Sequence, residues 1–214
     1  MIEYIVPENI DDRILKKTAS LLQNGGTAAI PTDSSWSIVC SMKSREGIKR
    51  LKVISKERDE RHFTLLCSDI SQFGEFCNLD NTRFRLIKRL SPGPYVFILK
   101  TLLGTEKALG LRRQEIGIRL PNYPVPLALI NTLGCPLYGI TAKRNMLPDE
   151  QDQDPADLWS EETLFEGGWE LDDIQDLDLI LDPGEDRNRI FSTVLDLSSG
   201  EVEMVRQGAG DWPA

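Results

Sequence analysis

Short apolar runs alternate with segments of helical periodicity along most of the chain. Apolar residues at helical spacing predict helices at about 11–24, 44–55, 70–76, 81–90 and 125–133. Short apolar runs bounded by glycine, proline or polar residues predict strands at 27–30, 38–41, 63–67, 95–100, 116–120, 137–141, 177–181, 193–197 and 202–205. Eight or nine strands that alternate with five or six helices indicate an α/β fold, a sheet with helices packed on it.

The polar stretch at 145–175 interrupts this alternation. It contains Pro148 and Pro155 and favours at most a short helix at 155–165. The chain shows no internal repeat and no Gly/Ser linker long enough to divide it. We therefore expect one domain over residues 1–214, with an acidic polar insertion at about 145–176.

The net charge of −9 is divided unevenly along the chain. Residues 1–144 hold 22 Lys and Arg against 14 Asp and Glu, a net charge of +8. Residues 145–186 hold 16 Asp and Glu and no Lys or Arg, a net charge of −16. The acidic stretch is either a solvated surface loop or a segment that masks the basic face. Outside this stretch the chain is basic enough to bind a polyanion.

Four cysteines, Cys40, Cys67, Cys77 and Cys135, form no CxxC pair and lie mostly inside apolar runs. They predict reduced, buried thiols rather than a disulfide framework or a metal site. No window approaches the roughly 18 apolar residues of a membrane span, and the N-terminal residues lack the pattern of a secretory signal. We expect a cytoplasmic protein without a membrane partner.

Common active-site signatures are absent from the sequence. His62 is the single histidine, and GxSxG, GxxxxGK[ST], GxGxxG and HExxH do not occur. A serine or cysteine hydrolase built on His62 stays open, but no local pattern positions a nucleophile.

Three polar features could bind an anion, and each has a plain structural alternative. The 31–35 turn, which includes Thr32 and Ser34, follows a buried strand and either binds a carboxylate or phosphate or is an ordinary Asx-turn. Lys56 and Arg58 either complement a helix C-terminus or bind phosphates. Basic residues at strand ends either face solvent or converge in one cleft: Arg119, Lys143 and Arg206.

Six motifs in register over about residues 10–210 resemble the YrdC/YciO family, best known for threonylcarbamoyl-AMP synthases. They are the GG-strand-PTD element at 25–33, the KxR motif at 56–58, the PGP turn at 92–94, G-x-R-x-P at 117–121, ST-V-D at 192–196 and R-x-G at 206–208. Within the family the chain is most similar to the YciO branch, in its PTDSS turn and in the segments at 63–67 and 84–88.

The resemblance implies a twisted, open, mixed sheet with flanking helices around a concave basic cleft. In the synthases this cleft binds ATP with Mg²⁺ as substrate, together with L-threonine. The threonine amine captures bicarbonate or CO₂, and the carbamate attacks the α-phosphate of ATP and releases pyrophosphate, a transferase step in tRNA modification. The protein contributes mainly positioning and charge neutralisation, and no tightly bound cofactor or protein-held metal is implied.

The family's site residues carry over by position in two groups. The nucleotide group is Lys56, Arg58, His62, Thr141, Lys143 and Arg206. The group for L-threonine or another small amino acid is Thr32, Ser34, Cys67, Arg119 and Ser192.

The chain departs from the family pattern at four positions. Lys143 stands where the SxN motif has asparagine, His62 stands for a lysine, Cys67 for a histidine, and Val96 for a threonine. These changes leave two hypotheses open. One is a synthase of the threonylcarbamoyl-AMP type or a close variant. The other is a protein that binds nucleotides, double-stranded RNA or tRNA without that chemistry.

Overall fold

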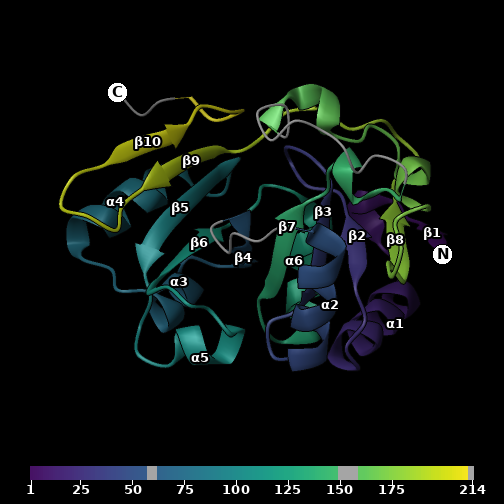
Figure 1. The fold of residues 1–214 in the computed structure, drawn as a ribbon, viewed down its shortest axis with the longest axis horizontal. Helices are drawn as coiled ribbons and strands as arrows, with labels where there is room; N and C mark the ends of the chain where they lie inside the picture. The colour runs from purple at the N-terminus through teal and green to yellow at the C-terminus, as the bar shows by residue number, and fades with distance from the viewer. Residues whose placement is uncertain (57–61, 149–158, 212–214) are drawn as a thin grey trace.

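The sheet is the organising element of the fold. The computed structural model describes residues 1–56, 62–148 and 159–211. Its ten strands lie in the order β1-β8-β2-β3-β7-β4-β6-β5-β9-β10. The predicted α/β class with an open mixed sheet is therefore confirmed (Figure 1).

The elements have the following bounds. The strands are β1 (Ile2–Tyr4), β2 (Ala28–Ile30), β3 (Ser37–Ser41), β4 (Thr64–Leu66), β5 (Tyr95–Lys100), β6 (Glu115–Arg119), β7 (Leu137–Thr141), β8 (Leu179–Asp182), β9 (Thr193–Asp196) and β10 (Glu203–Arg206). The α-helices are α1 (Asp12–Gln23), α2 (Arg45–Ser55), α3 (Ser71–Phe76), α4 (Asn81–Leu90), α5 (Thr105–Leu109) and α6 (Pro124–Leu133). Short 3-10 turns are η1 (Pro7–Asn9), η3 (Arg144–Met146), η5 (Glu161–Thr163) and η6 (Gly168–Leu171).

The sheet contains both parallel and antiparallel pairs. Strands β1, β8 and β2 run parallel, as do β4 with β6 and β5 with β9. The remaining neighbours are antiparallel. The first and last strands, β1 and β10, form the two edges and lie on opposite sides of the molecule (Figure 1).

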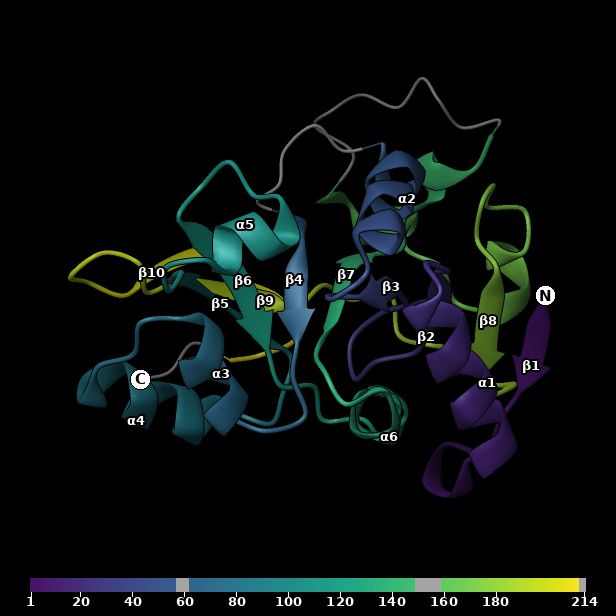
Figure 2. The same cartoon turned by 90° about the horizontal axis from the view of Figure 1, so that it is seen from below.

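The helices divide between the two halves of the sheet. Helices α1, α2 and α6 lie beside β2, β3 and β7, whereas α3, α4 and α5 lie beside β4, β5 and β6 (Figure 2). Helix α1 shows how sequence produces this packing. The Asp11 carboxylate accepts a hydrogen bond from the Arg13 backbone N–H at 2.8 Å, which caps the helix. Leu15, Ala19 and Leu22 then recur on one face, and all are buried.

The predicted strands and helices lie within one or two residues of the observed ones, and the four cysteines are free and buried as expected. Two elements escaped prediction, β1 and α5, which have three and five residues. Segments this short carry little periodicity, and β1 forms only by pairing with β8 across the whole chain.

The helix expected at 155–165 lies partly outside the described residues, and the described remainder holds only the η5 turn. The single-domain prediction covers the whole chain, including the undescribed segments, and stays a prediction. In the described part of the chain, no helix combines the length and the apolar character needed to cross a membrane.

Candidate functional site

A cavity of about 480 Å³ opens over the middle of the sheet. Thr64 of β4 lines the cavity and pairs with a glycine on each side, Gly117 on β6 and Gly139 on β7. A Cβ atom on Gly139 would lie 2.8 Å from Val39 Cγ1, and one on Gly117 would lie 3.0 Å from Val96 Cγ1. The missing side chains therefore let Val39 and Val96 pack closely against the two strands that flank Thr64.

Apolar, hydroxyl and basic side chains line different parts of the cavity. The apolar lining comes from Trp36, Leu66, Val96, Ile98, Ile140, Trp159, Val194 and Val205. Hydroxyl groups come from Thr32, Ser35, Ser37, Thr64, Thr141 and Ser192, and cationic or titratable groups come from His62, Arg119, Lys143 and Arg206. An apolar cavity with a few convergent polar groups, in the range of about 300–1,000 Å³, is typical of small-ligand sites.

Arg119 organises one end of the cavity. It ends β6 and is 5% exposed, so its charge depends on hydrogen bonds for stabilisation. Its Nη1 donates to Ser192 Oγ at 2.7 Å and to Ser34 Oγ at 3.1 Å, and its Nη2 pairs with the Asp33 carboxylate. Its Nε donates to the Gly93 carbonyl of the PGP turn at 3.3 Å. Residues from four distant segments therefore meet at one guanidinium.

The 31–35 turn places its hydroxyls at this end of the cavity. Thr32 Oγ1 donates to the Ser35 carbonyl at 2.7 Å and accepts from the Ser34 backbone N–H at 3.2 Å. The Ser34 and Ser192 hydroxyls lie 3.1 Å apart. The turn is therefore both an ST-turn and a part of the site, so the two readings of this motif are compatible.

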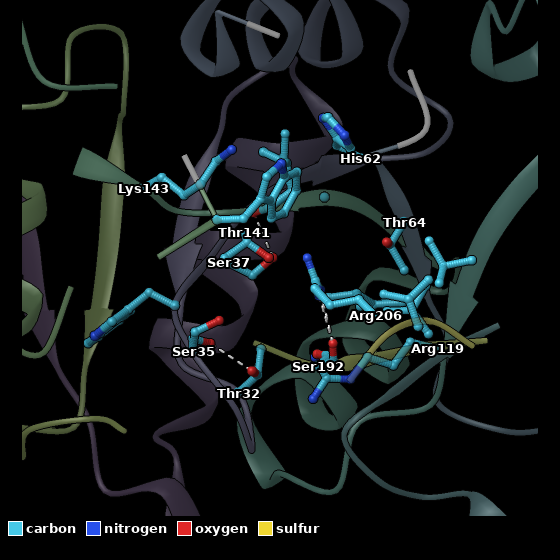
Figure 3. Close-up of a pocket in the computed structure, with 18 of the residues that line it drawn as sticks. Thr32, Ser35, Ser37, His62, Thr64, Arg119, Thr141, Lys143, Ser192 and Arg206 are labelled. Carbon is cyan, nitrogen blue, oxygen red and sulfur yellow. Dashed lines mark hydrogen bonds between the residues drawn. The ribbon is translucent and has the colours of Figure 1, made fainter. Parts of the chain in front are cut away.

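Arg206 lies between the two ends of the cavity (Figure 3). Its Nε and Nη2 donate to the Ser192 carbonyl at 3.2 and 2.9 Å. Gly208 permits this arrangement, because a Cβ there would lie 2.2 Å from the Phe191 carbonyl oxygen. The R-x-G ending and the Ser192 strand are therefore one packed unit.

His62, Thr141 and Lys143 lie toward the other end (Figure 3). Lys143 follows β7 and is 1% exposed, and its Nζ lies 4.3 Å from the centre of the Trp159 ring. The His62 ring meets the same indole edge-on, with centroids 4.7 Å apart.

The electrostatics of the cavity favour an anion. Burial, and to a smaller extent the neighbouring Arg119 charge, together lower the pKa of Arg206 to about 10. Burial also lowers the pKa of Arg119, although the Asp33 carboxylate acts to raise it. Both guanidiniums stay charged at neutral pH. Two partly desolvated cations held close together are stabilised by a negatively charged ligand.

The structure brings most of the predicted site residues to this cavity, but not all of them. Thr32, His62, Thr141, Lys143, Arg119, Ser192 and Arg206 line it, and Ser34 reaches it through Arg119 and Ser192. Arg58 lies outside the described residues.

Lys56 and Cys67 lie elsewhere than the cavity lining. Lys56 ends α2 in the left-handed conformation, and its Nζ donates to the carbonyls of Asn145 and Leu147 at 2.9 and 3.0 Å. Cys67 is fully buried, and burial strongly raises the pKa of its thiol.

Sequence reasoning missed Trp159 and most of the apolar lining. No local signal singled out Trp159, because the same acidic stretch also holds Phe165 and Trp169. Within residues 1–56, 62–148 and 159–211, no three His, Cys, Asp or Glu side chains gather closely enough to hold a metal ion.

Comparison with known proteins identifies the family. The model of the Sua5/YciO/YrdC family, described as "Telomere recombination", matches residues 20–208. The chain belongs to the Sua5/YciO/YrdC family. The family resemblance of the sequence motifs is thereby confirmed.

Two proteins with solved structures, YciO and Sua5, are similar to this chain. The uncharacterized protein YciO of Escherichia coli is 31% identical over 211 residues, covering 97% of this chain and 95% of YciO. Its crystal structure matches with a TM-score of 0.82 at 30% identity, over 99% of this chain and 97% of YciO. Sua5 of P. abyssi in complex with L-threonine matches with a TM-score of 0.80 at 19% identity, over 97% of this chain and 57% of Sua5.

The family also contains enzymes that carry a named activity. The threonylcarbamoyl-AMP synthase of Mus musculus is 24% identical over 199 residues, which cover 91% of this chain and 66% of the synthase. The chain is thus related to these synthases and shares the fold of YciO and Sua5 proteins.

Proposed function

We propose that this protein binds ATP and L-threonine, or another small amino acid, in the cavity and forms a carbamoyl-adenylate of the threonylcarbamoyl-AMP type. The observation that carries this proposal is the pairing of two binding ends in one cavity. Arg119 with Ser192 can hold a carboxylate, and Arg206 with Lys143 can hold phosphates. Arginine forks and lysine point charges suit these two anions.

The proposed reaction needs positioning more than it needs a protein nucleophile. The amino-acid amine adds bicarbonate and loses water to give a carbamate. A carbamate oxygen then attacks the α-phosphorus of ATP, the bond to the β-phosphate oxygen breaks, and pyrophosphate leaves with its magnesium. Arg206 lies between the two ends, where it can neutralise charge on the phosphate under attack (Figure 3).

Product formation tests the proposal directly. Purified protein is incubated with ATP, Mg²⁺, bicarbonate and L-threonine. Pyrophosphate is measured, and the carbamoyl-adenylate is detected by mass spectrometry. We expect release of pyrophosphate that depends on the amino acid. Arg206→Ala should lower kcat/KM at least about tenfold, because a charge-assisted bond to phosphate contributes about 1.5–3 kcal/mol.

Arg45→Ala is the matched control, since Arg45 is an exposed arginine at the start of α2 outside the cavity lining. It should leave kcat/KM unchanged. ATP binding without any amino-acid-dependent product, across threonine and a panel of other small amino acids, would refute the synthase proposal and leave a nucleotide-binding protein.

Binding of double-stranded RNA is a second candidate function. The observation that favours it is a row of exposed basic side chains on α4, namely Arg85, Lys88 and Arg89. Phosphate contacts make binding salt-dependent. Fluorescence anisotropy of an RNA duplex over a salt series should then show a steep slope, and the triple alanine variant should flatten it by roughly two to three contacts. A salt-independent signal would exclude this candidate.

A further inference from the structure

Trp159 is the centre of an aromatic and cationic cluster at the nucleotide end of the cavity. Its ring centre lies 4.3 Å from Lys143 Nζ and 4.9 Å from the Arg206 guanidinium carbon. The rings of His62 and Phe191 lie 4.7 and 5.4 Å away, measured between centroids. Three residues assigned to the nucleotide by sequence therefore contact one indole that was not assigned at all.

The exposure of Trp159 separates it from the core tryptophan of the cavity. Trp36 also lines the cavity but is fully buried, and its Nε1 donates to the Glu166 carbonyl at 3.0 Å. Trp159 is 36% exposed, so part of its ring faces the solvent-accessible space. It comes from the acidic segment 145–186, which otherwise supplies no cation and no side chain to this cavity lining among the described residues.

We propose that Trp159 is the stacking surface for the base of the bound nucleotide, an inference that rests on the proposed nucleotide-binding function. Indole is a favourable stacking partner because every nucleobase has a π-face. The ligand class follows from the combination of groups. An aromatic ring beside Lys143 and Arg206 suits a molecule that carries a base next to phosphates, which is a nucleoside phosphate.

Lys143 and Arg206 do not compete with the base for the Trp159 ring once a phosphate is bound. A cation over an aromatic ring is held weakly, whereas charge-assisted hydrogen bonds to phosphate oxygens are stronger. We expect bound phosphates to draw the Lys143 ammonium away from the indole and leave that part of the ring to the base, while Arg206 stays hydrogen-bonded to the Ser192 carbonyl. In the unliganded protein the cations keep the exposed ring oriented toward the cavity.

Calorimetric titration of two ligands, each with Mg²⁺, tests the inference. ATP carries phosphates and a base, whereas inorganic tripolyphosphate carries phosphates alone. Trp159→Ala should weaken ATP binding about tenfold, the order expected for one lost base-aromatic stack. Tripolyphosphate binding should change less than about twofold, because the variant leaves both cations in place. Trp159→Phe should restore ATP binding to within about threefold of wild type.

Trp169→Ala is the matched control, since Trp169 is 70% exposed and lies outside the cavity lining. It should bind both ligands as the wild type does, and circular dichroism verifies that each variant is folded.

Three outcomes would overturn the inference. Equal weakening of both ligands would mean that Trp159 only positions the cations, and tighter binding of both would mean that it obstructs the cavity. Unchanged ATP binding would mean that the base lies elsewhere. If wild-type protein binds neither ligand, the proposed function itself fails, and the inference fails with it.

Discussion

At the scale of the residue, the buried ion pair of Arg119 and Asp33 is the most consequential contact. Both side chains are largely removed from water, with exposed fractions of 6% and 12%. Asp33 Oδ2 has no hydrogen-bond partner among the described atoms, so Arg119 provides most of the compensation for this carboxylate. A buried pair is costly to break by removing one partner.

Removal of the Arg119 guanidinium should therefore destabilise the protein as well as the site. Arg119→Ala is expected to lower the free energy of unfolding by about 3–5 kcal/mol, because it leaves the Asp33 carboxylate uncompensated. Asp33→Ala and the double variant complete a cycle measured by urea denaturation. We expect a coupling energy of about 1 kcal/mol or more, and additive single-variant effects would contradict the role assigned to the pair.

At the scale of the element, close packing against the strand backbone requires glycine at some positions of the sheet and not at others. Gly139 in β7 lies against the backbone and side chains of β3, and a Cβ there would also lie 3.1 Å from the Ile38 carbonyl oxygen. Gly74 in α3 is exposed, and a Cβ there would meet nothing within 4 Å. The same substitution should therefore have opposite effects at these two positions.

Gly139→Ala is expected to lower the free energy of unfolding by about 1–3 kcal/mol through overpacking. Gly74→Ala is expected to raise it by about 0.5–1 kcal/mol, because alanine restricts the unfolded chain and favours the helix. Urea denaturation measures both changes. Equal destabilisation by the two variants would show that close approach at Gly139 is not the cause.

Asp178 joins three elements through one carboxylate. It accepts the Thr27 backbone N–H just before β2 at 2.8 Å and a bond from Arg50 of α2 at 2.8 Å, and it lies directly before β8. Burial acts to raise the pKa of Asp178, but the hydrogen bonds from Arg50 and Thr27 outweigh it, and the pKa falls below its ordinary value.

Because the pKa of Asp178 is lowered in the folded state, the contribution of Asp178 to the free energy of unfolding depends on pH. The folded state favours the ionised Asp178 carboxylate. The stabilisation is therefore fully present above the pKa that this aspartate has in the unfolded chain, about 3.9. It is lost as the pH falls through the lower pKa of the folded state. Asp178→Asn should lower the free energy of unfolding by about 1 kcal/mol at pH 7, and the difference from wild type should shrink below about pH 4. A difference that is constant with pH would contradict this assignment.

At the scale of the whole molecule, the cavity depends on strands from both halves of the sheet. Its lining comes from β3 and β7 on one side and from β4, β6, β5, β9 and β10 on the other. A ligand that contacts both sides binds only the folded chain. Ligand binding should therefore stabilise the whole fold, not one half of it.

ATP with Mg²⁺ at about 100 times its Kd should stabilise the protein by about 2.7 kcal/mol. For a chain of this size that corresponds to a rise in Tm of about 5–10 °C. Differential scanning fluorimetry measures the shift, and Arg206→Ala should reduce it while Arg45→Ala should not. An equal shift in both variants would place the nucleotide outside this cavity.

Most of the local structure, and the chemical character of the site, could be predicted from the amino-acid sequence. Apolar periodicity depends on neighbours in the chain, so the strands at 95–100 and 137–141 and the helix at 81–90 were predicted at their observed bounds. The motifs containing Arg119, Ser192 and Arg206 marked residues that meet in the cavity. Because Arg119 and Arg206 are arginines, the sequence also indicated that this part of the cavity is cationic.

Which distant segments become neighbours could not be predicted in this way, because it depends on the folded arrangement. Pairing of β1 with β8 joins residues about 178 positions apart, and no local pattern specifies such a contact. Lys56 and Trp159 show the same limit at the site. The sequence assigned Lys56 to the nucleotide but could not show that its Nζ bonds to the 145–147 backbone. Nor could it show that Trp159, from the acidic segment, contacts Lys143 and His62. Where a side chain points depends on packing between distant elements, and packing exists only once the chain has folded.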